Sequence, residues 1–235
     1  MAPTPGLLCV RSRITSEALS DAVFNDFYTN HHLPDFISSG VADLALRYKN
    51  ADSSKKWQYL AVYRLPDIGF LSDPEKMEKI RMQHETLPNG GNIKDYTELN
   101  SKIYLPIQSF KGQGHKTGRA NVLFIAEIEP AEKTDEEALG DFYEKQHFHM
   151  LSMHHQYHRS NRFKTVDGSK PRFAALHEFD NADLDQHMRT TMNSTKWSKD
   201  IEGNAQILEI SCWELITEQG KIGENLIVND ALRVS

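Results

Sequence analysis

Cysteine is scarce in this sequence, and long apolar runs are missing. The 235 residues include only Cys9 and Cys212, each inside a short apolar segment typical of a β-strand. Two isolated cysteines exclude a disulfide framework, so we expect buried free thiols in a reducing compartment. No stretch approaches the roughly 20 apolar residues that span a bilayer, and the apolar run before Arg11 is too short for a secretory signal. We therefore expect a cytoplasmic protein with no membrane partner.

Charge of one sign is not concentrated anywhere along the chain. Lysine and arginine number 27 against 33 aspartate and glutamate residues, which gives a net charge of −6. The cations are scattered, whereas binding to the phosphates of nucleic acid requires clustered cations. We therefore expect no nucleic acid partner. Hydrophobic residues make up 39% of the chain, which is enough for a substantial core at this length.

Several nucleotide-binding, nucleophile and metal motifs are also absent. The sequence has no G-x-G-x-x-G opening a helix, no Walker loop and no G-x-S-x-G elbow. Histidine is frequent over 147–158, but its spacing matches neither H-E-x-x-H nor paired C-x-x-C zinc motifs. We therefore expect no metal and no cofactor, and we interpret these histidines as surface or cavity residues. They are His147, His149, His154, His155 and His158.

The sequence does contain an internal repeat. The segment DFYTNHH at Asp26–His32 recurs as DFYEKQH at Asp141–His147. With the same offset, Arg47 falls on Arg162, and an apolar run at 7–10 falls on another at 122–125. Each copy is about 100 residues long, much longer than one unit of a solenoid. The sequence therefore predicts two small domains in one chain.

Each copy shows the same order of predicted elements. Hydrophobic patterning in the first copy predicts strands at 7–14, 41–49, 57–65 and 101–110, and helices over 16–33 and 74–84. The second copy has predicted strands at 120–128, 157–164, 172–179 and 206–216, and helices over 135–153 and from 184 to 192. Pro34 lacks an N–H group and is expected to end or kink the first helix near Leu33. Gly40 is the expected stop signal.

This β-α-β-β-α-β order is that of the ferredoxin-like fold. A four-stranded sheet with both helices on one face leaves its other face bare. Two such units can bury those faces together and join their edge strands, which removes open edges. We therefore predict an α+β protein in which two fused ferredoxin-like units form a dimeric α/β-barrel within one chain, with domains at 1–112 and 113–235. A homodimer of the fused chain is compatible with this architecture.

A known family shares these features. The first copy carries the pattern aromatic-Tyr-x-x-x-His-x-Pro at Phe27–Pro34, and the second carries a weaker version at Phe142–His149, where His149 replaces the proline. On these residues, on Arg47–Lys49 and on Cys212–Glu214, the chain resembles the EthD-like family of dimeric α/β-barrel proteins, and especially its fungal tandem-repeat members. The resemblance extends from about residue 6 to residue 216. It implies a small-molecule pocket without a cofactor, because such proteins include polyketide cyclases, dehydratase- or decarboxylase-type lyases and anthrone oxygenases.

Two helical stripes are the candidate sites. An amphipathic helix turns such a stripe toward its sheet, so the polar members would face the space between helix and sheet. A cavity with a few convergent polar groups fits that position. The first stripe consists of Phe24, Tyr28, His32 and Phe36, and the second of Leu139, Tyr143, His147 and Leu151.

These residue types suit proton transfer. His32 could act as a base and Tyr28 as a hydrogen-bond donor to a developing enolate, with His147 and Tyr143 as their counterparts in the second copy. Arg47 could hold a carboxylate or phenolate of the substrate if its side chain points inward. The predicted substrate-binding residues are Arg47, Phe24, Phe36, Tyr63, Arg162 and His177. The alternative is structural: His32 and His147 would bond a carbonyl and stabilise the core, and Tyr63 would lie on a solvated sheet face.

The function remains open between three classes at this point. The first is a cofactor-independent enzyme that cyclises, dehydrates or decarboxylates a hydrophobic oxygenated metabolite of the polyketide type by acid–base chemistry. The second is a cofactor-free monooxygenase of the anthrone type, and the third is a protein without turnover, with a role in binding, stress response or assembly into larger oligomers. Fold alone does not decide between them.

Overall fold

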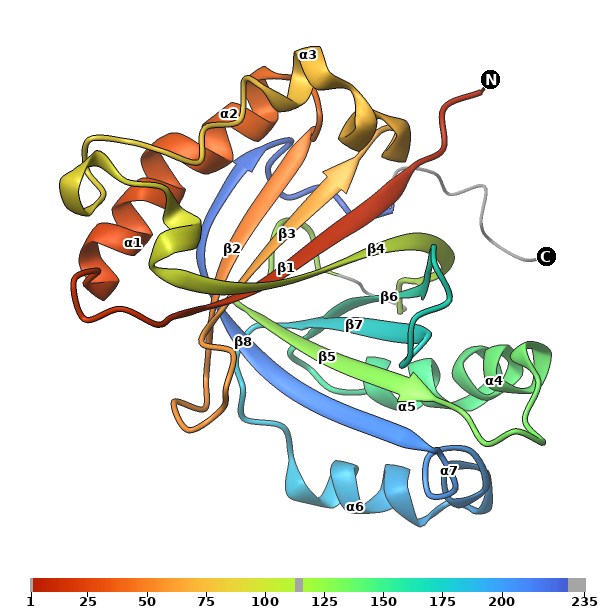
Figure 1. Ribbon diagram of the computed structural model, residues 1–235. Helices are drawn as coiled ribbons and strands as arrows, with labels where there is room; N and C mark the ends of the chain where they lie inside the picture. The colour runs from red at the N-terminus through yellow and green to blue at the C-terminus, as the bar shows by residue number, and fades with distance from the viewer. Residues whose placement is uncertain (1, 113–115, 228–235) are drawn as a thin grey trace. The chain divides into compact units, whose positions relative to one another are not determined.

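The computed structural model describes residues 2–112 and 116–227, which form two compact units. The first unit comprises described residues 2–105 and 213–227, and the second comprises described residues 106–212. The elements that begin in the first unit are β1 (Gly6–Ile14), α1 (Asp21–Phe27), a π-helical turn (Tyr28–His32), α2 (Leu33–Ser38), β2 (Leu44–Asn50), β3 (Tyr59–Leu65), α3 (Pro74–Met77) and β4 (Thr97–Phe110) (Figure 1). Three 3-10 turns lie at Ile68–Ser72, Pro88–Gly90 and Ile93–Asp95.

The second unit continues the same alternation of strands and helices. Its elements are β5 (Val122–Glu129), α4 (Glu136–Phe142), a π-helical turn (Tyr143–His147), α5 (Phe148–Ser152), β6 (Tyr157–Thr165), β7 (Phe173–Phe179), α6 (Gln186–Ser194), α7 (Lys196–Ile201) and β8 (Ile207–Gly220). The helix predicted over 135–153 is confirmed, with the π-helical turn inserted at its centre. The helix predicted from 184 to 192 is followed by a second helix, α7, which was not predicted. Thr195 between the two has an extended backbone and caps α7 by accepting a hydrogen bond from Ser198 N–H.

The strands confirm the predicted fold class. They are hydrogen-bonded in the closed order β1-β3-β2-β8-β5-β7-β6-β4, as expected for ferredoxin-like units combined in an α/β-barrel. The units do not divide at residue 112. They divide after Leu105 in β4 and after Cys212 in β8. These two strands have 14 residues each, so each one is long enough to supply strand residues to both units.

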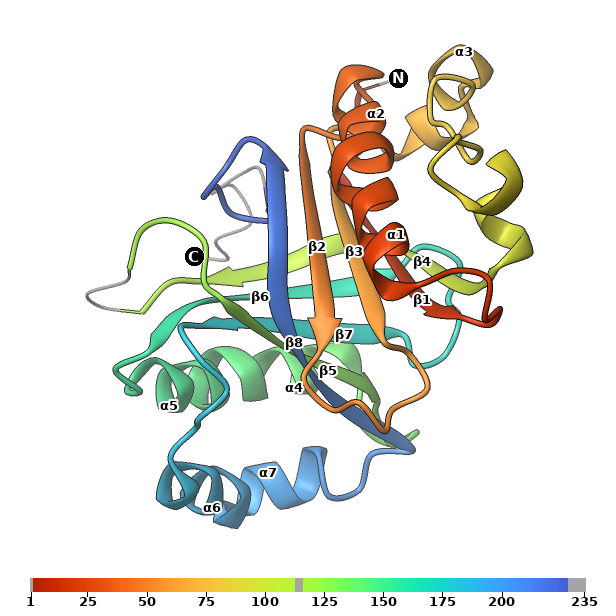
Figure 2. The ribbon, with the colours of Figure 1, turned by 90° about the vertical axis from the view of Figure 1, so that its left-hand side faces the viewer.

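The helices of the first unit cover one face of its strands. Ser20 caps α1 by accepting a hydrogen bond from Val23 N–H, and Phe24 and Phe27 are buried. Figure 2 shows α1 and α2 running alongside β2 and β3. The pairing of β2 with β3 and of β3 with β1 places Tyr63 opposite both Ala45 and Leu8. The core of this unit therefore lies between these helices and the sheet.

Pro34 does not end the first helix, so of the two predicted effects, an end or a kink, the end is wrong. The chain passes through the π-helical turn, in which Leu33 N–H donates to the Tyr28 carbonyl, and Pro34 occupies the first turn of α2. A proline leaves a preceding carbonyl without its helical donor. The side-chain amide of Gln219 donates to the carbonyl of Thr29, which lies one π-turn before the proline. The helix then ends at Ser38, and Gly40 follows with φ of +71°, as expected for a stop signal.

The prediction of a helix over 74–84 is largely wrong, since α3 covers only Pro74–Met77. The cause is a contact distant in sequence. The buried carboxylate of Asp35 in α2 accepts from the Arg81 N–H at 3.0 Å and from the Arg81 guanidinium at 2.7 and 2.9 Å. Because Arg81 donates its amide to Asp35 instead of to its own helix, the segment continues as turns.

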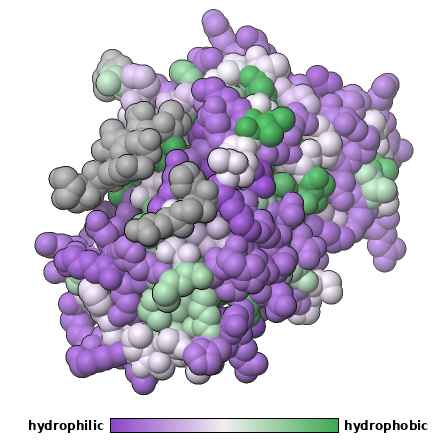
Figure 3. Space-filling view, turned by 180° about the vertical axis from the view of Figure 1, so that it is seen from behind, coloured by the Kyte–Doolittle hydropathy of each residue, from purple (hydrophilic) through white to green (hydrophobic). Residues whose placement is uncertain are grey.

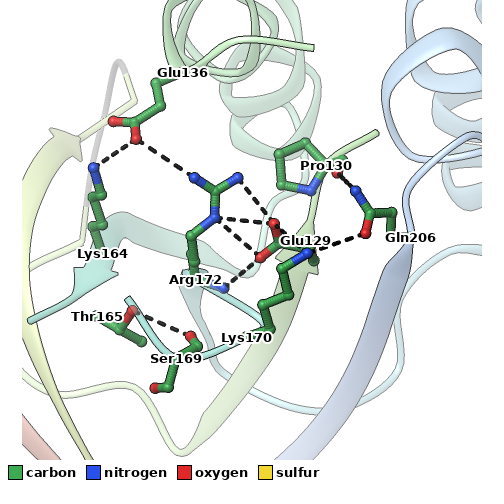
Figure 4. A network of polar contacts seen from close by, with 9 residues as sticks. All are labelled: Glu129, Pro130, Glu136, Lys164, Thr165, Ser169, Lys170, Arg172 and Gln206. Carbon is green, nitrogen blue, oxygen red and sulfur yellow. Dashed lines mark hydrogen bonds and ion pairs between the residues drawn. The ribbon is translucent and has the colours of Figure 1, made fainter. Parts of the chain in front are cut away.

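A polar network lies at the end of β5 in the second unit (Figure 4). The Glu129 carboxylate, 1% exposed, accepts from the Arg172 N–H at 3.0 Å and from its guanidinium at 2.9 Å. Lys170 contacts the same carboxylate at 3.7 Å and donates to Gln206, whose amide donates to the Pro130 carbonyl. The network therefore links the end of β5 with the starts of β7 and β8.

Figure 3 shows one face of the molecule, on which hydrophilic residues prevail and hydrophobic ones form small separate groups. None of the helices in residues 2–112 and 116–227 is both long and apolar enough to cross a membrane. Cys9 and Cys212 form no disulfide, and both are half-buried instead of buried because they lie on β1 and on the variably exposed β8.

Candidate functional site

The stripe predicted in the first unit exists and is buried. Successive ring centroids lie 5.0 Å apart for Phe24 and Tyr28, 4.9 Å for Tyr28 and His32, and 5.2 Å for His32 and Phe36. Phe36 stacks on Tyr63 at 3.9 Å. Tyr63 is 1% exposed, so its alternative placement on a solvated face is wrong. The structure therefore brings the helical and strand residues of this prediction together.

Arg47 lies inside this aromatic cluster. Its guanidinium carbon is 3.8 Å from the ring centroid of Tyr28 and 4.6 Å from those of Phe24 and Tyr59. It donates to the Ser12 hydroxyl at 3.5 Å, and burial lowers its pKa. Aromatic faces attract a cation, which offsets part of the cost of burying it. Arg47 thus points inward, which is the condition for the predicted substrate contact, and it is packed against rings.

His32 has a clear structural contact. Its Nδ1 lies 3.0 Å from the Arg81 carbonyl, and since a carbonyl only accepts, Nδ1 carries the proton in this contact. Burial lowers the pKa of His32 to about 4, so the imidazole is neutral at neutral pH. Burial also raises the pKa values of Tyr28 and Tyr63. A catalytic role for His32 and Tyr28 stays a prediction, and the contacts with Arg81 and the rings account for their burial.

A cavity of about 440 Å³ lies in the second unit. It is bounded by β5, β7 and β8 on the sheet side and by α5, α6 and α7 on the helix side. Most of its lining is apolar: Phe124, Ala126, Leu151, Phe179, Leu184, Met188, Met192, Leu208 and Ile210. Its polar and charged lining residues are His147, His177, Arg189, Asn193, Ser198, Lys199 and Glu202. A largely apolar hollow with a few convergent polar groups is typical of a small-molecule site.

Three titratable side chains meet in this cavity. His147 Nδ1 lies 3.7 Å from the Glu202 carboxyl oxygen Oε1, and the rings of His147 and His177 are 5.7 Å apart. Burial lowers the pKa of His147 to about 4 and that of His177 well below its ordinary value. Burial raises the pKa of Glu202 to about 7, with a smaller opposing effect of the Ser198 hydroxyl. At neutral pH the site therefore combines two neutral imidazoles with one carboxyl group that can both take and give a proton.

A hydrogen-bonded chain holds His177 in place. Its Nδ1 lies 2.7 Å from the Ser160 hydroxyl, which is 3.0 Å from the Tyr157 hydroxyl. Tyr157 also contacts the Phe110 carbonyl at 3.2 Å. In the described part of the chain, His177 Nε2 is buried and has no hydrogen-bond partner. A ligand group is one candidate partner for that nitrogen, since buried polar atoms are usually paired.

Local structure positions Glu202 at the end of α7. It caps the C-terminus of this helix, and its N–H donates to the Ser198 carbonyl at 2.8 Å. A Cβ atom on the following residue, Gly203, would lie 2.6 Å from the Lys199 carbonyl, so glycine lets the chain turn close to the helix. A carboxylate at a helix C-terminus is disfavoured by the helix dipole, which also favours the protonated form.

The sequence prediction located this site in part. His147, His177 and Leu151 line the cavity as expected, and Glu202 was missed. Tyr143 and Arg162 are not among its lining residues. Instead the Arg162 guanidinium carbon lies 4.3 Å from the Tyr143 ring centroid, and its Nη1 donates to the side-chain oxygen of Gln108 at 2.7 Å. The one signal for Glu202 was an acidic residue next to a glycine at the end of a helix.

The histidine-rich segment is dispersed in the structure. His149 is exposed and packs on Phe110, His154 and His155 stack on each other at 4.8 Å, and His158 pairs with Asp180 at 2.6 Å. Among the residues that the structure describes, no three His, Cys, Asp or Glu side chains are grouped so that they could hold a metal ion.

Acid should destabilise the first unit through His32. Its folded pKa of about 4 lies below the ordinary 6.5, so its stabilising contribution is full above pH 6.5 and is lost as the pH falls toward 4. Between those pH values we expect the free energy of unfolding to fall by about 3 kcal/mol more in the wild type than in His32→Phe. Urea unfolding across this pH range measures the difference. His149→Gln, at an exposed position, should behave as the wild type, and parallel pH curves for all three proteins would contradict the assignment.

Comparisons with known proteins agree with this fold. No family model matches the chain. Core atranone cluster (CAC) protein 1 of Stachybotrys chlorohalonatus is 30% identical over 196 residues, which cover 77% of this chain and 84% of that protein.

Solved structures are similar at lower identity. One is a protein from Lactobacillus acidophilus assigned as a monooxygenase, with 11% identity, a TM-score of 0.57, and coverage of 94% of this chain and 98% of that chain. Another is an anthrone oxidase-like protein with 12% identity, a TM-score of 0.53, and coverage of 91% and 92%. These two show the fold, whereas the likeness to the Stachybotrys protein extends over most of both sequences. This chain therefore belongs to the same family as core atranone cluster protein 1.

Proposed function

We propose that the protein is a cofactor-independent enzyme of secondary metabolism that acts on a hydrophobic, oxygenated, polyketide-like molecule. The observation that carries this proposal is Glu202, whose carboxyl has a pKa of about 7 inside a mostly apolar cavity, beside two neutral imidazoles. A base with a pKa near the working pH is well matched to proton transfer. His32 and His147, which the sequence suggested as bases, have pKa values of about 4 and are therefore much weaker bases.

The chemistry we propose starts with the ionised form of Glu202. Its carboxylate takes a proton from a carbon next to a carbonyl group, and the C–H electron pair moves into the carbonyl to form an enolate. The enolate carbon then attacks a second carbonyl of the same molecule, and the new alkoxide takes the proton back from Glu202. This cyclisation is balanced without an oxidant. Loss of the resulting hydroxyl with a neighbouring proton would release one water and give the dehydrated product.

The two histidines would serve the enolate. In its neutral form an imidazole carries one N–H, which can donate to the developing oxyanion without a full charge in the cavity. The ring of His147 lies beside Glu202, and the buried, unpartnered Nε2 of His177 belongs to the ring next to that of His147. The apolar lining would exclude water, so each of these hydrogen bonds would be stronger than in solution.

The relatives support this setting. The Stachybotrys protein is named for its place in the core atranone cluster, which fits a role in the making of a secondary metabolite. The Tyr-x-x-x-His pattern occurs on the π-helical turns Tyr28–His32 and Tyr143–His147 of the two units, so we also propose that the chain is a tandem member of the EthD-like type.

A cofactor-free oxygenase is the second candidate. It is favoured by the likeness in fold to the anthrone oxidase-like protein and to the Lactobacillus protein assigned as a monooxygenase. In that reaction the same carboxylate would deprotonate an electron-rich substrate, and molecular oxygen would be the oxidant. The two candidates therefore share the base and differ in whether oxygen is consumed.

Incubation with a panel of linear polyketones and anthrones, followed by mass spectrometry, tests the proposal. We expect a product with unchanged mass or with the loss of one water. His147→Phe should lower the rate of turnover. His32→Phe, which lies outside the cavity lining, should have the wild-type rate per folded molecule. Isotopically labelled oxygen in the product would favour the oxygenase instead. Ligand-induced thermal stabilisation without any product would reject both reactions and indicate a binding protein.

A further inference from the structure

The cavity of the second unit carries two cations whose role the proposed chemistry does not explain. Arg189 of α6 and Lys199 of α7 both line it, and both are exposed at the surface. They are the two cationic residues in a lining that is otherwise apolar, neutral or, at Glu202, acidic. The two cations can therefore be reached from solvent at the cavity.

These cations differ from their neighbours in lacking an acidic partner. In the same unit Lys196 pairs with Asp200 at 3.1 Å, Lys145 with Asp141 at 2.6 Å, and Lys164 with Glu136. Within residues 106–112 and 116–212, no ion pair joins an acidic side chain to Arg189 or Lys199. Their positive charge is thus available to a ligand.

The placement of Glu202 gives the cavity a direction. Lys199 and Glu202 are three residues apart at the end of α7, so they lie on neighbouring positions of the same helix face. Above pH 7 the Glu202 carboxylate repels an anionic group, while Arg189 and Lys199 attract one. An anionic ligand would therefore enter with its charge at the cations and its neutral end toward Glu202.

We propose that the cavity takes an amphiphilic carboxylic acid, with the carboxylate held by Arg189 and Lys199 and the apolar body between the sheet and α6. This inference rests on the proposed function and specifies its substrate class. Arginine favours a carboxylate because the planar guanidinium can donate two parallel hydrogen bonds to it. Met188 and Met192, on the same helix as Arg189, supply an adaptable apolar wall for the body of the ligand.

The carboxylate would also place the reacting carbons. With the acid group fixed at α6 and α7, a carbonyl further along the chain comes to Glu202, and the repulsion from Glu202 disfavours the reversed orientation. The carboxylate is not one of the reacting groups in this scheme, so it remains unchanged by the reaction. The substrate class is therefore an acid that carries one or more ketones in its apolar part.

Binding of three matched probes tests this inference without any turnover. The probes are an anthracene carboxylic acid, its methyl ester and the corresponding anthracene phosphonic acid, followed by their fluorescence. We expect the acid to bind about tenfold tighter than the ester, because two exposed ion pairs of about threefold each together contribute about 1.4 kcal/mol. The preference should shrink in high salt, which screens exposed charges.

Variants of the two cations identify the residues responsible. Arg189→Gln and Lys199→Gln should each weaken binding of the acid about threefold, and the double variant should bind acid and ester equally. Ester binding should not change in any of them. Lys196→Gln, in the same helix as Lys199 but outside the cavity lining, is the matched control and should retain the full preference.

Several outcomes would overturn the inference. Equal affinity for acid and ester in the wild type, a preference that survives in the double variant, or no binding of either probe at millimolar concentration would each do so. Tighter binding of the phosphonic acid would reject a carboxylate as the head group. Turnover of neutral polyketones without any preference for acids would keep the proposed function and reject this inference alone.

Discussion

The Glu202→Gln variant should turn over substrate at least about 100-fold more slowly than the wild type, since a positioned general base contributes on this order. The amide has nearly the same shape as the carboxyl group and cannot take a proton. In the wild type the rate should rise as the pH increases through about 7, where the carboxylate forms, and the variant should not show this rise. Initial rates from pH 5 to pH 9 measure both effects.

Stability gives a second measurement of the same group. The folded pKa of Glu202, about 7, lies above the ordinary 4.5, so its contribution to stability is full below pH 4.5 and is lost as the pH rises through 7. Over this range the free energy of unfolding of the wild type should therefore fall by up to about 3 kcal/mol, and that of Glu202→Gln should not. Glu209→Gln, at an exposed position on β8, is the matched control. If Glu202→Gln and wild type have the same rate and the same pH profile, Glu202 is not the base.

Glu178→Gln should destabilise the second unit by about 3–5 kcal/mol, as expected when one partner of a buried ion pair is removed. The Glu178 carboxylate, 1% exposed, accepts from Arg119 at 2.8 Å and from Arg159 at 3.0 Å, and both arginine side chains are less than 10% exposed. A glutamine cannot neutralise two buried guanidinium groups, so their charge would remain in a poorly solvated position. Chemical denaturation at neutral pH measures the loss.

A surface ion pair of the same unit is the control for this prediction. Asp141→Asn removes the partner of Lys145, and the two side chains are 39% and 60% exposed. Exposed pairs contribute little, so a change of at most about 0.5 kcal/mol is expected. A loss of stability of similar size in both variants would show that burial of the ion pairs of Glu178 with Arg119 and Arg159 does not determine their contribution to stability.

Local patterns were good guides where the contacts are local. The four-residue spacing of Phe24, Tyr28, His32 and Phe36 placed them on one buried stripe, because side chains one helical turn apart share a face. Turn signals and alternation likewise located the strands to within a few residues. The helix expected over 74–84 failed because its amide at Arg81 is taken by Asp35, 46 residues earlier. No sequence pattern within 74–84 predicts a contact with a residue so far away in the chain.

The candidate site shows the same division. His147 and His177 could be named from the sequence, since each lies in a segment with clear helical or strand character. The pKa values of these histidines could not be predicted from the sequence, because they depend on burial by side chains from other elements. Glu202 looks like an ordinary surface residue at a helix end, and its raised pKa arises only when the cavity walls remove it from water.

The sequence by itself determined the element order, the α+β class and the inward face of each first helix, because these follow from periodicity and from the hydrogen-bonding limits of the backbone. The tertiary structure decided where the units divide within β4 and β8, that Arg47 packs among rings, and that a cavity opens beside α6 and α7. It also decided which group can act as a base. The reason is that cavities, desolvation and charge pairing are properties of residues distant in sequence, whereas periodicity describes neighbours.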